Sequence, residues 1–425
     1  MKKTITFIDL FAGTGGIRLA FEQAMYSHGF KTKCVKSVEI DDHACETYEL
    51  NFHENPKGDV REIEDLPKFD VLLAGFPCQA FSYAGKQKGF ADTRGTLFFE
   101  VERILTKYHP KLCFLENVRG LTTHDGGKTF ETILSKLNAL GYHVEYRLIN
   151  ASSMGIPQNR TRIYFICTYN FIPKLTIENN LGAADSHSYK RHTSQKLFSF
   201  AESPKNVTVK DILEINPDLK YDCSKEFVDE LRYALDGKFD MLAGKRLIDT
   251  RHGNSIHSWN LGHKGKCTKN EIDFMNLLIS NRRRHDFGTE QDGKALTIEQ
   301  IKTFYQNGDI TYVIESLLNK KYLKGKEGKY NPVCGNMSFE VFKFLDPDSI
   351  CITLTSSDAN RLGVYYNGRI RRLTPRECAR LQGYPDTYII HPNDACAYKQ
   401  FGNAVCVPVI ERLISDLLDN NIIFE

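Results

Sequence analysis

Residues 5–167 alternate short apolar runs with amphipathic stretches, and this alternation restricts the fold more than any other feature. Apolar runs typical of buried strands occupy residues 5–10, 34–40, 71–74, 112–115, 142–149 and 162–167. Segments with helical spacing lie between the first five runs, at residues 17–26, 42–50, 97–108 and 130–140. Strands that alternate with helices favour a mostly parallel sheet with helices on both faces. We therefore predict an α/β fold here.

The alternation ends after Cys167, and the stretch 168–370 is too long to be one loop of a compact domain. We place a first domain at residues 1–175 and a second, smaller one at 176–395. Within the second, residues 245–284 are strongly basic, and Thr268–Glu271 has the pattern of a capping box that opens a helix. Residues 295–330 resemble a winged helix-turn-helix, with a second helix that reads DNA and a basic hairpin as the wing. A solvated basic face on an ordinary helical insert explains the same residues equally well.

Bulk composition limits the environment rather than the function. A net charge of +3 over 425 residues means that any nucleic-acid-binding charge must be concentrated locally. The 12 cysteines include no C-x-x-C pair, the N-terminus has no signal-peptide pattern, and no apolar run could span a bilayer. We expect a cytoplasmic protein without a membrane association, whose cysteines are mostly small buried side chains.

A glycine turn follows the first predicted strand. Residues 11–16 read F-A-G-T-G-G, and Glu39 closes the second predicted strand. Glycines at a strand-to-helix turn let the backbone approach a ligand, and a carboxylate at the next strand end can accept ribose hydroxyls. The turn departs from G-x-G-x-x-G, so a ligand without a pyrophosphate is favoured over a dinucleotide. A plain tight turn is an equally good explanation of the glycines alone.

Reactive side chains recur at the carboxyl ends of later strands, where ligands gather in open parallel sheets. Cys78 follows the run 71–74 within G-F-P-C-Q, and the small-residue segment 82–95 after it could close as a lid. Glu116 closes the next strand, either as a helix-capping acid or as a carboxyl kept partly protonated by burial. Arg160 and Arg162 lie two apart, a spacing that suits a carboxylate or ring carbonyl.

The order of these blocks resembles the DNA (cytosine-5) methyltransferases of restriction–modification systems. The resemblance covers nearly all of the chain outside residues 168–345. It includes residues 11–16, Glu39, Asp59, 75–82, 116–118, 158–162, R-R-L-T-P-R-E-C-A-R-L-Q-G-Y-P at 371–385 and Q-F-G-N-A-V at 400–405. It implies a Rossmann-like fold that uses S-adenosylmethionine, plus a smaller domain that recognises DNA, and a segment at 396–425 that returns to the catalytic domain.

The resemblance also implies a covalent mechanism on a cytosine flipped out of duplex DNA. Cys78 matches the thiolate that adds to ring carbon 6 and makes carbon 5 nucleophilic. Glu116 matches the group that protonates ring nitrogen 3. Arg160 matches an arginine that holds the base and its glutamate partner, and Arg162 one that contacts the ring carbonyl.

Binding residues follow from the same match. The implied cofactor residues are Phe11, Gly13, Gly15, Glu39 on the ribose, Asp59 on the adenine amino group, Pro77, Leu97 and Asn403. The implied DNA contacts are Ser82 and Arg94 in the lid and Thr353, while Arg282, Arg283 and Arg284 are predicted phosphate contacts from charge alone. We expect double-stranded DNA as substrate, a cognate restriction endonuclease as a possible partner, a monomer, and no metal.

Three other functions fit parts of the sequence. A zinc cytosine deaminase needs P-C-x-x-C, and Phe81 stands where the second cysteine would be, so this function fails. An RNA cytosine-5 methyltransferase of related fold would share the cysteine and the glutamate. A catalytically silent DNA-binding regulator on the same scaffold would have no need of Cys78, Glu116, Arg160 and Arg162 together.

Overall fold

A computed structural model describes residues 4–77, 97–181, 207–288, 294–333 and 339–424. These residues form two compact units. The first unit contains residues 1–214, 350–359 and 375–425, and the second contains 215–349 and 360–374. The division therefore does not fall at the predicted boundaries, because the described residues 176–181, 207–214, 350–359 and 375–395 belong to the first unit. A boundary of this kind depends on contacts between distant parts of the chain, which local patterns do not contain.

The first unit is built on a six-stranded sheet in the order β2-β1-β3-β4-β6-β5. Its strands are β1 (Thr4–Leu10), β2 (Lys31–Val38), β3 (Val71–Ala74), β4 (Leu112–Val118), β5 (Tyr142–Asn150) and β6 (Thr161–Tyr169). The first four pair in parallel, whereas β6 is antiparallel to both β4 and β5. All six strands were expected from their apolar runs, and the α/β fold class is confirmed.

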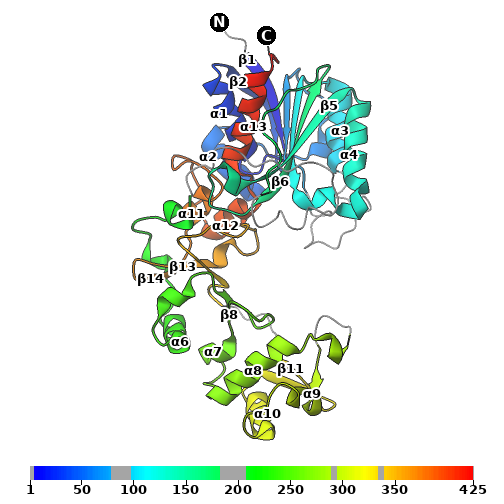
Figure 1. The fold of residues 1–425 in the computed structure, drawn as a ribbon. Helices are drawn as coiled ribbons and strands as arrows, with labels where there is room; N and C mark the ends of the chain where they lie inside the picture. Colours follow the sequence, from blue (N-terminus) through cyan, green and yellow to red (C-terminus); the bar gives the residue numbers. More distant parts are fainter. Residues whose placement is uncertain (1–3, 78–96, 182–206, 289–293, 334–338, 425) are drawn as a thin grey trace. The chain divides into compact units, whose positions relative to one another are not determined.

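Helices cover both faces of this sheet (Figure 1). α1 (Gly16–Ser27) and the C-terminal α13 (Val407–Asn420) lie together on one face, and α3 (Leu97–Tyr108) and α4 (Lys128–Ala139) lie on the other. The unit also contains α2 (Asp42–Phe52), α11 (Pro375–Arg380) and α12 (Asp394–Asn403). The predicted helices at 17–26, 42–50, 97–108 and 130–140 coincide with α1 to α4. The chain thus returns to its first sheet after the second unit.

The buried carboxyl of Asp9 in β1 belongs to a polar network with Tyr48 and Arg18. Asp9 is 1% exposed, its Oδ2 accepts a 3.4 Å hydrogen bond from Tyr48, and its Oδ1 has no partner among the described residues. Arg18 donates to Tyr48 at 2.9 Å and pairs with Glu54 at 2.8 Å. Burial raises the pKa of Asp9 to about 7, although the charge of Arg18 opposes the shift.

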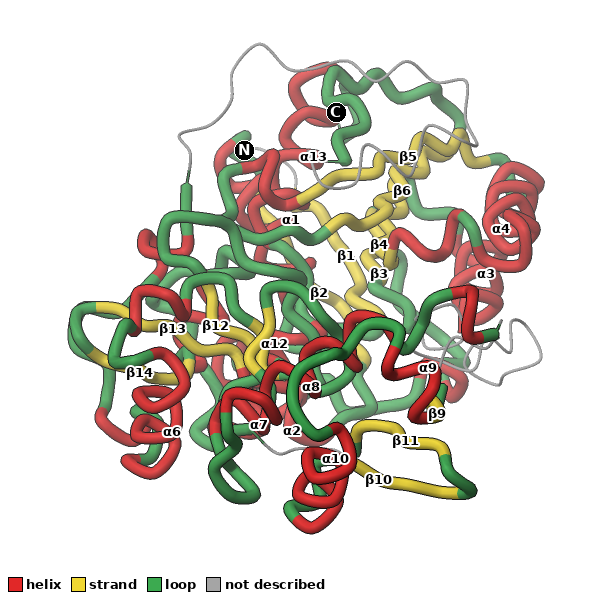
Figure 2. The backbone as a smooth tube through the Cα atoms, turned by 60° about the horizontal axis from the view of Figure 1, so that its bottom comes forward, coloured by secondary structure: helices red, strands yellow, loops and turns green. Residues whose placement is uncertain are grey.

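The second unit has two small sheets. A five-stranded sheet in the order β14-β13-β12-β7-β8 is accompanied by α6 (Lys225–Leu235) and α7 (Ser258–Leu261). Its strands are β7 (Arg246–Leu247), β8 (Ser255–Ile256), β12 (Lys343–Leu345), β13 (Leu362–Tyr366) and β14 (Arg369–Arg372). A separate three-stranded sheet, β10-β11-β9, combines β9 (Leu296–Thr297), β10 (Leu323–Lys326) and β11 (Lys329–Pro332). α8 (Lys269–Asn281), α9 (Ile298–Lys302) and α10 (Ile310–Asn319) belong to this second part, in which Figure 2 shows the β10–β11 hairpin beside α10.

The helices of the described ranges include no candidate for a membrane span. None of them combines the length and the apolar character that crossing a bilayer requires.

The raised pKa of Asp9 predicts a pH dependence of stability. The pKa of this carboxyl rises from 3.8, its ordinary value, to about 7 in the folded protein, so the folded state holds a proton that the unfolded state releases between these values. The wild type should therefore lose stability, relative to Asp9→Asn, as the pH rises from about 4 to about 7.5. A difference of about 3 in pKa corresponds to about 4 kcal/mol. Thermal midpoints measured across this range test the prediction, with the exposed Asp125→Asn as control. A constant difference between wild type and Asp9→Asn would show that Asp9 is ionised in the folded protein.

The close approach of α12 to residues 355–356 predicts a strict requirement for glycine. A Cβ at Gly402 would lie 2.4 Å from the amide nitrogen of Ser356 and the carbonyl carbon of Thr355. Alanine normally favours a helix by about 1 kcal/mol over glycine, but overpacking against backbone costs about 1–3 kcal/mol. We expect Gly402→Ala to lower the thermal midpoint. Gly58→Ala is the matched control, because its nearest neighbour would be 3.7 Å away. A midpoint for Gly402→Ala at or above the wild type would contradict this packing.

Candidate active site

A cavity of about 830 Å³ lies in the first unit, at the carboxyl ends of the parallel strands. This volume falls within the range of pockets that bind small molecules and cofactors. The predicted site residues that line it are Phe11, Gly13, Glu39, Asp59, Pro77, Leu97, Glu116, Arg160, Arg162, Thr353 and Asn403. They come from the first strand–helix turn, from segments that follow β2 and β3, from the start of α3, from β4, from the start of β6 and the residue before it, and from the segments 350–359 and 375–425. The fold therefore gathers residues that are far apart in the sequence.

The glycine turn forms one wall of the cavity and has left-handed backbone at several positions. Phe11 has φ 55°, which is rare for a residue with a side chain and is found mainly at functional sites. Gly13 has φ 53°, and nothing lies within 4 Å of the place that a Cβ would occupy, so the backbone here is open to a ligand. Gly15 does not line the cavity. A Cβ there would lie 2.2 Å from the Phe52 ring, so Gly15 is required for packing.

Main-chain donors hold Glu39 beside this turn. Its Oε2 accepts from Gly13 N–H at 2.8 Å, and its Oε1 accepts from the amides of Ile40 and Asp41 at 2.8 Å each. A carboxylate has about four acceptor positions, so three are used and about one remains for a hydroxyl. Glu39 follows β2 rather than ending it, since β2 stops at Val38. The backbone thus fixes the carboxylate's orientation before a ligand binds.

Asp59 lies on the same side of the cavity and begins a short 3₁₀ helix at Val60–Glu62. Its Oδ1 accepts from the Arg61 amide at 2.9 Å and from Arg61 Nε at 3.0 Å. The hydrogen bonds from Arg61 hold the pKa of Asp59 below its usual range. Asp59 is therefore an anionic acceptor at neutral pH.

Glu116 and Arg162 form an ion pair at the opposite side of the cavity. Arg162 lies across from Val118 in the β4–β6 ladder, and its Nε is 3.2 Å from Glu116 Oε1. The strand β4 continues to Val118, so Glu116 lies within the strand and does not cap a helix. Burial raises the pKa of the Glu116 carboxyl, while the charges of Arg162 and Arg160 oppose this. Of the two explanations left open by the sequence, the structure favours a buried carboxyl with a raised pKa over a helix-capping acid.

Arg160 binds the main chain of two distant segments. Its Nη1 donates to the carbonyl of Leu354 at 2.8 Å and its Nη2 to the carbonyl of Ala404 at 2.6 Å. Arg162 forms the ion pair with Glu116, whereas Arg160 acts on this carboxyl through its charge, and the expected contact of Arg160 with the base stays a prediction. Burial lowers the pKa of Arg160 to about 9, which leaves it cationic at neutral pH. Its Nε, buried at the cavity, has no acceptor among the described residues.

Further polar contacts support the cavity, and two of the side chains that make them, Gln158 and Tyr384, were not singled out by the sequence analysis. Gln158 accepts from the Leu354 amide at 2.9 Å and donates to the carbonyl of Leu381 at 2.6 Å, and the Thr353 hydroxyl donates to the carbonyl of Asn159. Tyr384 contacts the glycine turn through a 3.1 Å hydrogen bond between its hydroxyl and that of Thr14. The family-like blocks at 158–162 and 371–385 contained these residues, but only long-range contacts reveal their roles.

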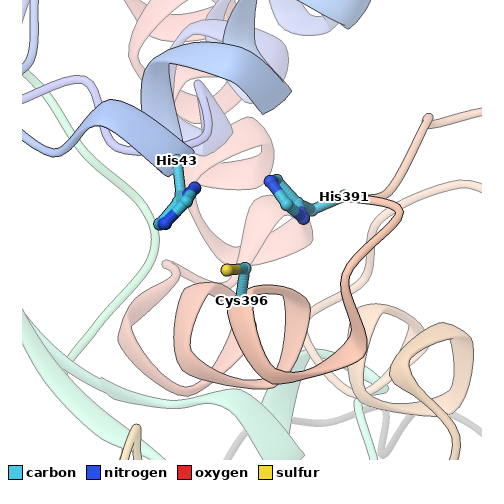
Figure 3. A group of neighbouring side chains, drawn as sticks. All are labelled: His43, His391 and Cys396. Carbon is cyan, nitrogen blue, oxygen red and sulfur yellow. The ribbon is translucent and has the colours of Figure 1, made fainter.

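Two histidines and a cysteine meet near the cavity, although no metal was predicted. Ligand atoms of His43, His391 and Cys396 lie within 4.8 Å of one another (Figure 3). Glu46 Oε2 is 2.8 Å from His391 Nε2 and 3.3 Å from His43 Nδ1. His391 Nδ1 accepts from the Asn393 amide at 2.9 Å, so both ring nitrogens of His391 are already engaged. These hydrogen bonds join α2 to the segment that leads into α12.

The remaining predicted site residues lie elsewhere. Cys78, Ser82 and Arg94 fall outside the described residues. Arg282 belongs to the second unit, is 3% exposed, and donates from Nη1 to Asn331 Oδ1 at 2.7 Å. It cannot contact a phosphate from this position, so its assignment to DNA binding is wrong. Arg283 and Arg284 are exposed, and Arg284 pairs with Asp286 at 2.8 Å.

Comparison with known proteins places the whole chain in one family. A family model described as "C-5 cytosine-specific DNA methylase" matches residues 5–419. The chain is 61% identical over 418 residues to Type II methyltransferase M.BanI of Aneurinibacillus aneurinilyticus, covering 98% of this chain and 96% of that protein. It is 59% identical to M.HgiCI of Herpetosiphon aurantiacus, with 97% of each chain covered. It is 34% identical to M.HhaI of Haemophilus parahaemolyticus, covering 96% of this chain and 93% of that one.

Solved structures agree at the level of the fold. An Entamoeba histolytica methyltransferase structure, EhMeth, superposes with a TM-score of 0.53 at 18% identity, covering 98% of this chain and 99% of that chain. A putative DNA modification methyltransferase from an Escherichia coli prophage gives 0.51 at 20% identity, covering 98% and 99%. From the family match and from relatives at up to 61% identity over nearly the full length, the chain belongs to the C-5 cytosine-specific DNA methylases and is a DNA (cytosine-5) methyltransferase.

Proposed function

We propose that this enzyme transfers a methyl group from S-adenosylmethionine to carbon 5 of a cytosine flipped out of duplex DNA, as the modification enzyme of a Type II restriction–modification system. The observation that carries the proposal is the cavity, which has the glycine turn, Glu39 and Asp59 at one side and the Glu116–Arg162 pair at the other. Its two sides thus offer a place for a cofactor and a place for a base. The names of the two relatives near 60% identity, both Type II methyltransferases, support the biological setting.

The residues at the glycine turn fit S-adenosylmethionine. Open space at Gly13 admits a ligand against the backbone, Glu39 keeps about one acceptor position for a ribose hydroxyl, and Asp59 is an acceptor for an adenine amino group. Pro77, Leu97 and Asn403 line the same cavity. When bound, S-adenosylmethionine supplies an electrophilic methyl group. The role of the protein is to hold that methyl group against the base and to exclude water.

The chemistry on the base would use Cys78, Glu116 and Arg162. The Cys78 sulfur forms a bond to ring carbon 6 while the Glu116 carboxyl delivers a proton to ring nitrogen 3, which makes carbon 5 nucleophilic. After the methyl group is in place, a water molecule takes the proton from carbon 5, nitrogen 3 returns its proton to the Glu116 carboxylate, and the carbon–sulfur bond breaks so that Cys78 leaves as a thiolate. Arg162 uses two of its five donors on Glu116 and on the Thr161 carbonyl within the described residues, so further donors suit the ring carbonyl.

DNA contacts are proposed in each unit. Flipping a base out of the stack costs a few kcal/mol, which contacts along the duplex must offset. Ser82, Arg94 and Thr353 are proposed contacts to the flipped nucleotide and its backbone, and Arg283 and Arg284 are proposed phosphate contacts. A cognate restriction endonuclease that cuts the same site is the partner that this setting implies.

Replacing the nucleophile tests the mechanism. Cys78→Ser should abolish methylation, because a neutral hydroxyl adds to the ring far more slowly than a thiolate. Bisulfite sequencing of duplex DNA exposed to each protein measures the product, and a binding titration shows that DNA is still bound. Cys34→Ser, at a half-buried cysteine outside the cavity, is the control. Undiminished methylation by Cys78→Ser would refute the covalent step. If the wild-type enzyme methylated tRNA in preference to duplex DNA, the assignment of duplex DNA as the substrate would be refuted.

Glu116 predicts a pH dependence of the rate. Because burial raises its pKa, the protonated form persists to a higher pH than in an ordinary glutamate, and activity should fall as the pH rises through this raised pKa. Glu116→Gln cannot deliver a proton, so kcat should fall by about 100- to 10,000-fold and that limb of the pH profile should vanish. Glu131→Gln, at an exposed position of α4, is the control. A Glu116→Gln profile with an unchanged basic limb would assign the titration to another group.

A further inference from the structure

The second unit contains a complete winged helix-turn-helix. The elements α8, β9, α9, α10, β10 and β11 follow one another in the order helix, strand, helix, helix, strand, strand, and β11 lies between β10 and β9 in an antiparallel sheet. This is the order of a winged helix, whose last helix enters the major groove. They share one core that includes Trp259, Phe274, Leu278, Ile301, Val313, Leu317, Tyr322 and Leu323.

The orientation of α10 is fixed from its buried side. Val313, Ile314 and Leu317 face the core. Glu271 of α8, which is 2% exposed, accepts from Ser316 at 2.5 Å and from Lys320 Nζ at 2.7 Å. The same carboxylate closes the predicted capping box with Thr268, which the structure confirms. A buried, fully bonded carboxylate of this kind sets the rotation of α10 about its axis.

The opposite side of α10 presents an uninterrupted polar stripe. Thr311, Glu315 and Asn319 are exposed and lie four residues apart, so they share one face of the helix. Tyr312 stands beside them and is 70% exposed. These residue types match base edges in the major groove. A carboxylate accepts from the amino group of cytosine, and an amide pairs with adenine. A threonine hydroxyl can bond either a donor or an acceptor, and its methyl group can contact the methyl group of thymine.

The hairpin β10–β11 carries the positive charge that α10 lacks. Lys324 and Lys326 share a face of β10, Lys329 lies directly opposite Lys326, and all three are exposed. Asn331 continues this face toward the base of the hairpin, where the buried Arg282 at the end of α8 donates to it. Arg282 thus braces the hairpin against α8, which explains why the first arginine of the run 282–284 is buried.

We propose that Thr311, Tyr312, Glu315 and Asn319 of α10 determine the DNA sequence that the enzyme methylates, and that Lys324, Lys326 and Lys329 anchor the hairpin to phosphates. This inference rests on the proposed function, since it names how the same enzyme selects its site. The two sets of residues make separable predictions. Base contacts specify a sequence, whereas phosphate contacts strengthen binding to every sequence alike.

The test uses the full-length enzyme and a library of duplex DNA mapped by bisulfite sequencing. Glu315→Ala and Asn319→Ala should each lower kcat/KM at the wild-type site by about 5- to 150-fold and admit new bases at one position, with an unchanged salt slope. Lys326→Ala combined with Lys329→Ala should keep the same set of sites and weaken binding to all sequences. For this double variant, the slope of the logarithm of the DNA-binding constant against the logarithm of the salt concentration should become less steep by about 2.

Controls separate this inference from the proposed function. Glu226→Gln, on the exposed face of α6 in the same unit, should leave both the site set and the salt slope unchanged. Because all these positions are exposed, the variants should have the thermal midpoint of the wild type, and this measurement confirms that they are folded. Arg282→Ala should lower the midpoint, since it removes a buried hydrogen-bonded charge. If the wild-type protein methylated no duplex DNA, the proposed function would be contradicted. Methylation by Glu315→Ala and Asn319→Ala at the wild-type site set and rate would overturn only the assignment of α10.

Discussion

The cavity depends on the buried guanidinium of Arg160, which joins three parts of the chain. It precedes β6 and donates to the main chain at Leu354 and at Ala404, which lie 194 and 244 residues later in the sequence. Gln158 adds a second link to Leu354 and one to Leu381. A buried charge of this kind is strongly destabilising unless its donors are satisfied, so the returning segments and the sheet stabilise each other. Through these bonds the returning segments 350–359 and 375–425, with Thr353 and Asn403, reach a cavity whose other lining residues belong to the first 162 residues.

Two carboxylates in this cavity show how surroundings divide similar groups between binding and chemistry. Glu39 receives three main-chain N–H donors, which fix it as an acceptor beside the glycine turn. Glu116 lies in a strand, is buried, and has one arginine at 3.2 Å, so its pKa is raised and it can carry a proton. The first group suits the binding of a neutral hydroxyl, and the second suits proton delivery to a ring nitrogen. The same residue type thus suits two functions, because main-chain N–H groups surround Glu39 whereas burial and one arginine surround Glu116.

Local pattern predicted the strands and first four helices of the sheet domain, because buried strands and amphipathic helices leave a periodicity that neighbouring residues reveal. Several residues of the family-like blocks line the cavity, among them Phe11, Glu39 and Glu116, whereas Gly15 serves packing against Phe52. The main-chain partners of Arg160 could not be predicted, because Leu354 and Ala404 lie in distant segments of the chain. Burial of Arg282 was hidden for the same reason, since Asn331 lies 49 residues away. The capping box at Thr268 was predictable, because both of its partners lie within four residues.

The proposed mechanism requires a sulfur atom of this chain to bond transiently to the cytosine that it modifies. Duplex DNA with 5-fluorocytosine at the target position tests this directly, because fluorine at carbon 5 cannot leave as a proton and the adduct persists. Incubation with S-adenosylmethionine, digestion and mass spectrometry should identify one DNA-linked peptide, with the link at Cys78. A stable adduct at another residue, or no adduct under conditions in which unmodified DNA is methylated, would contradict the mechanism.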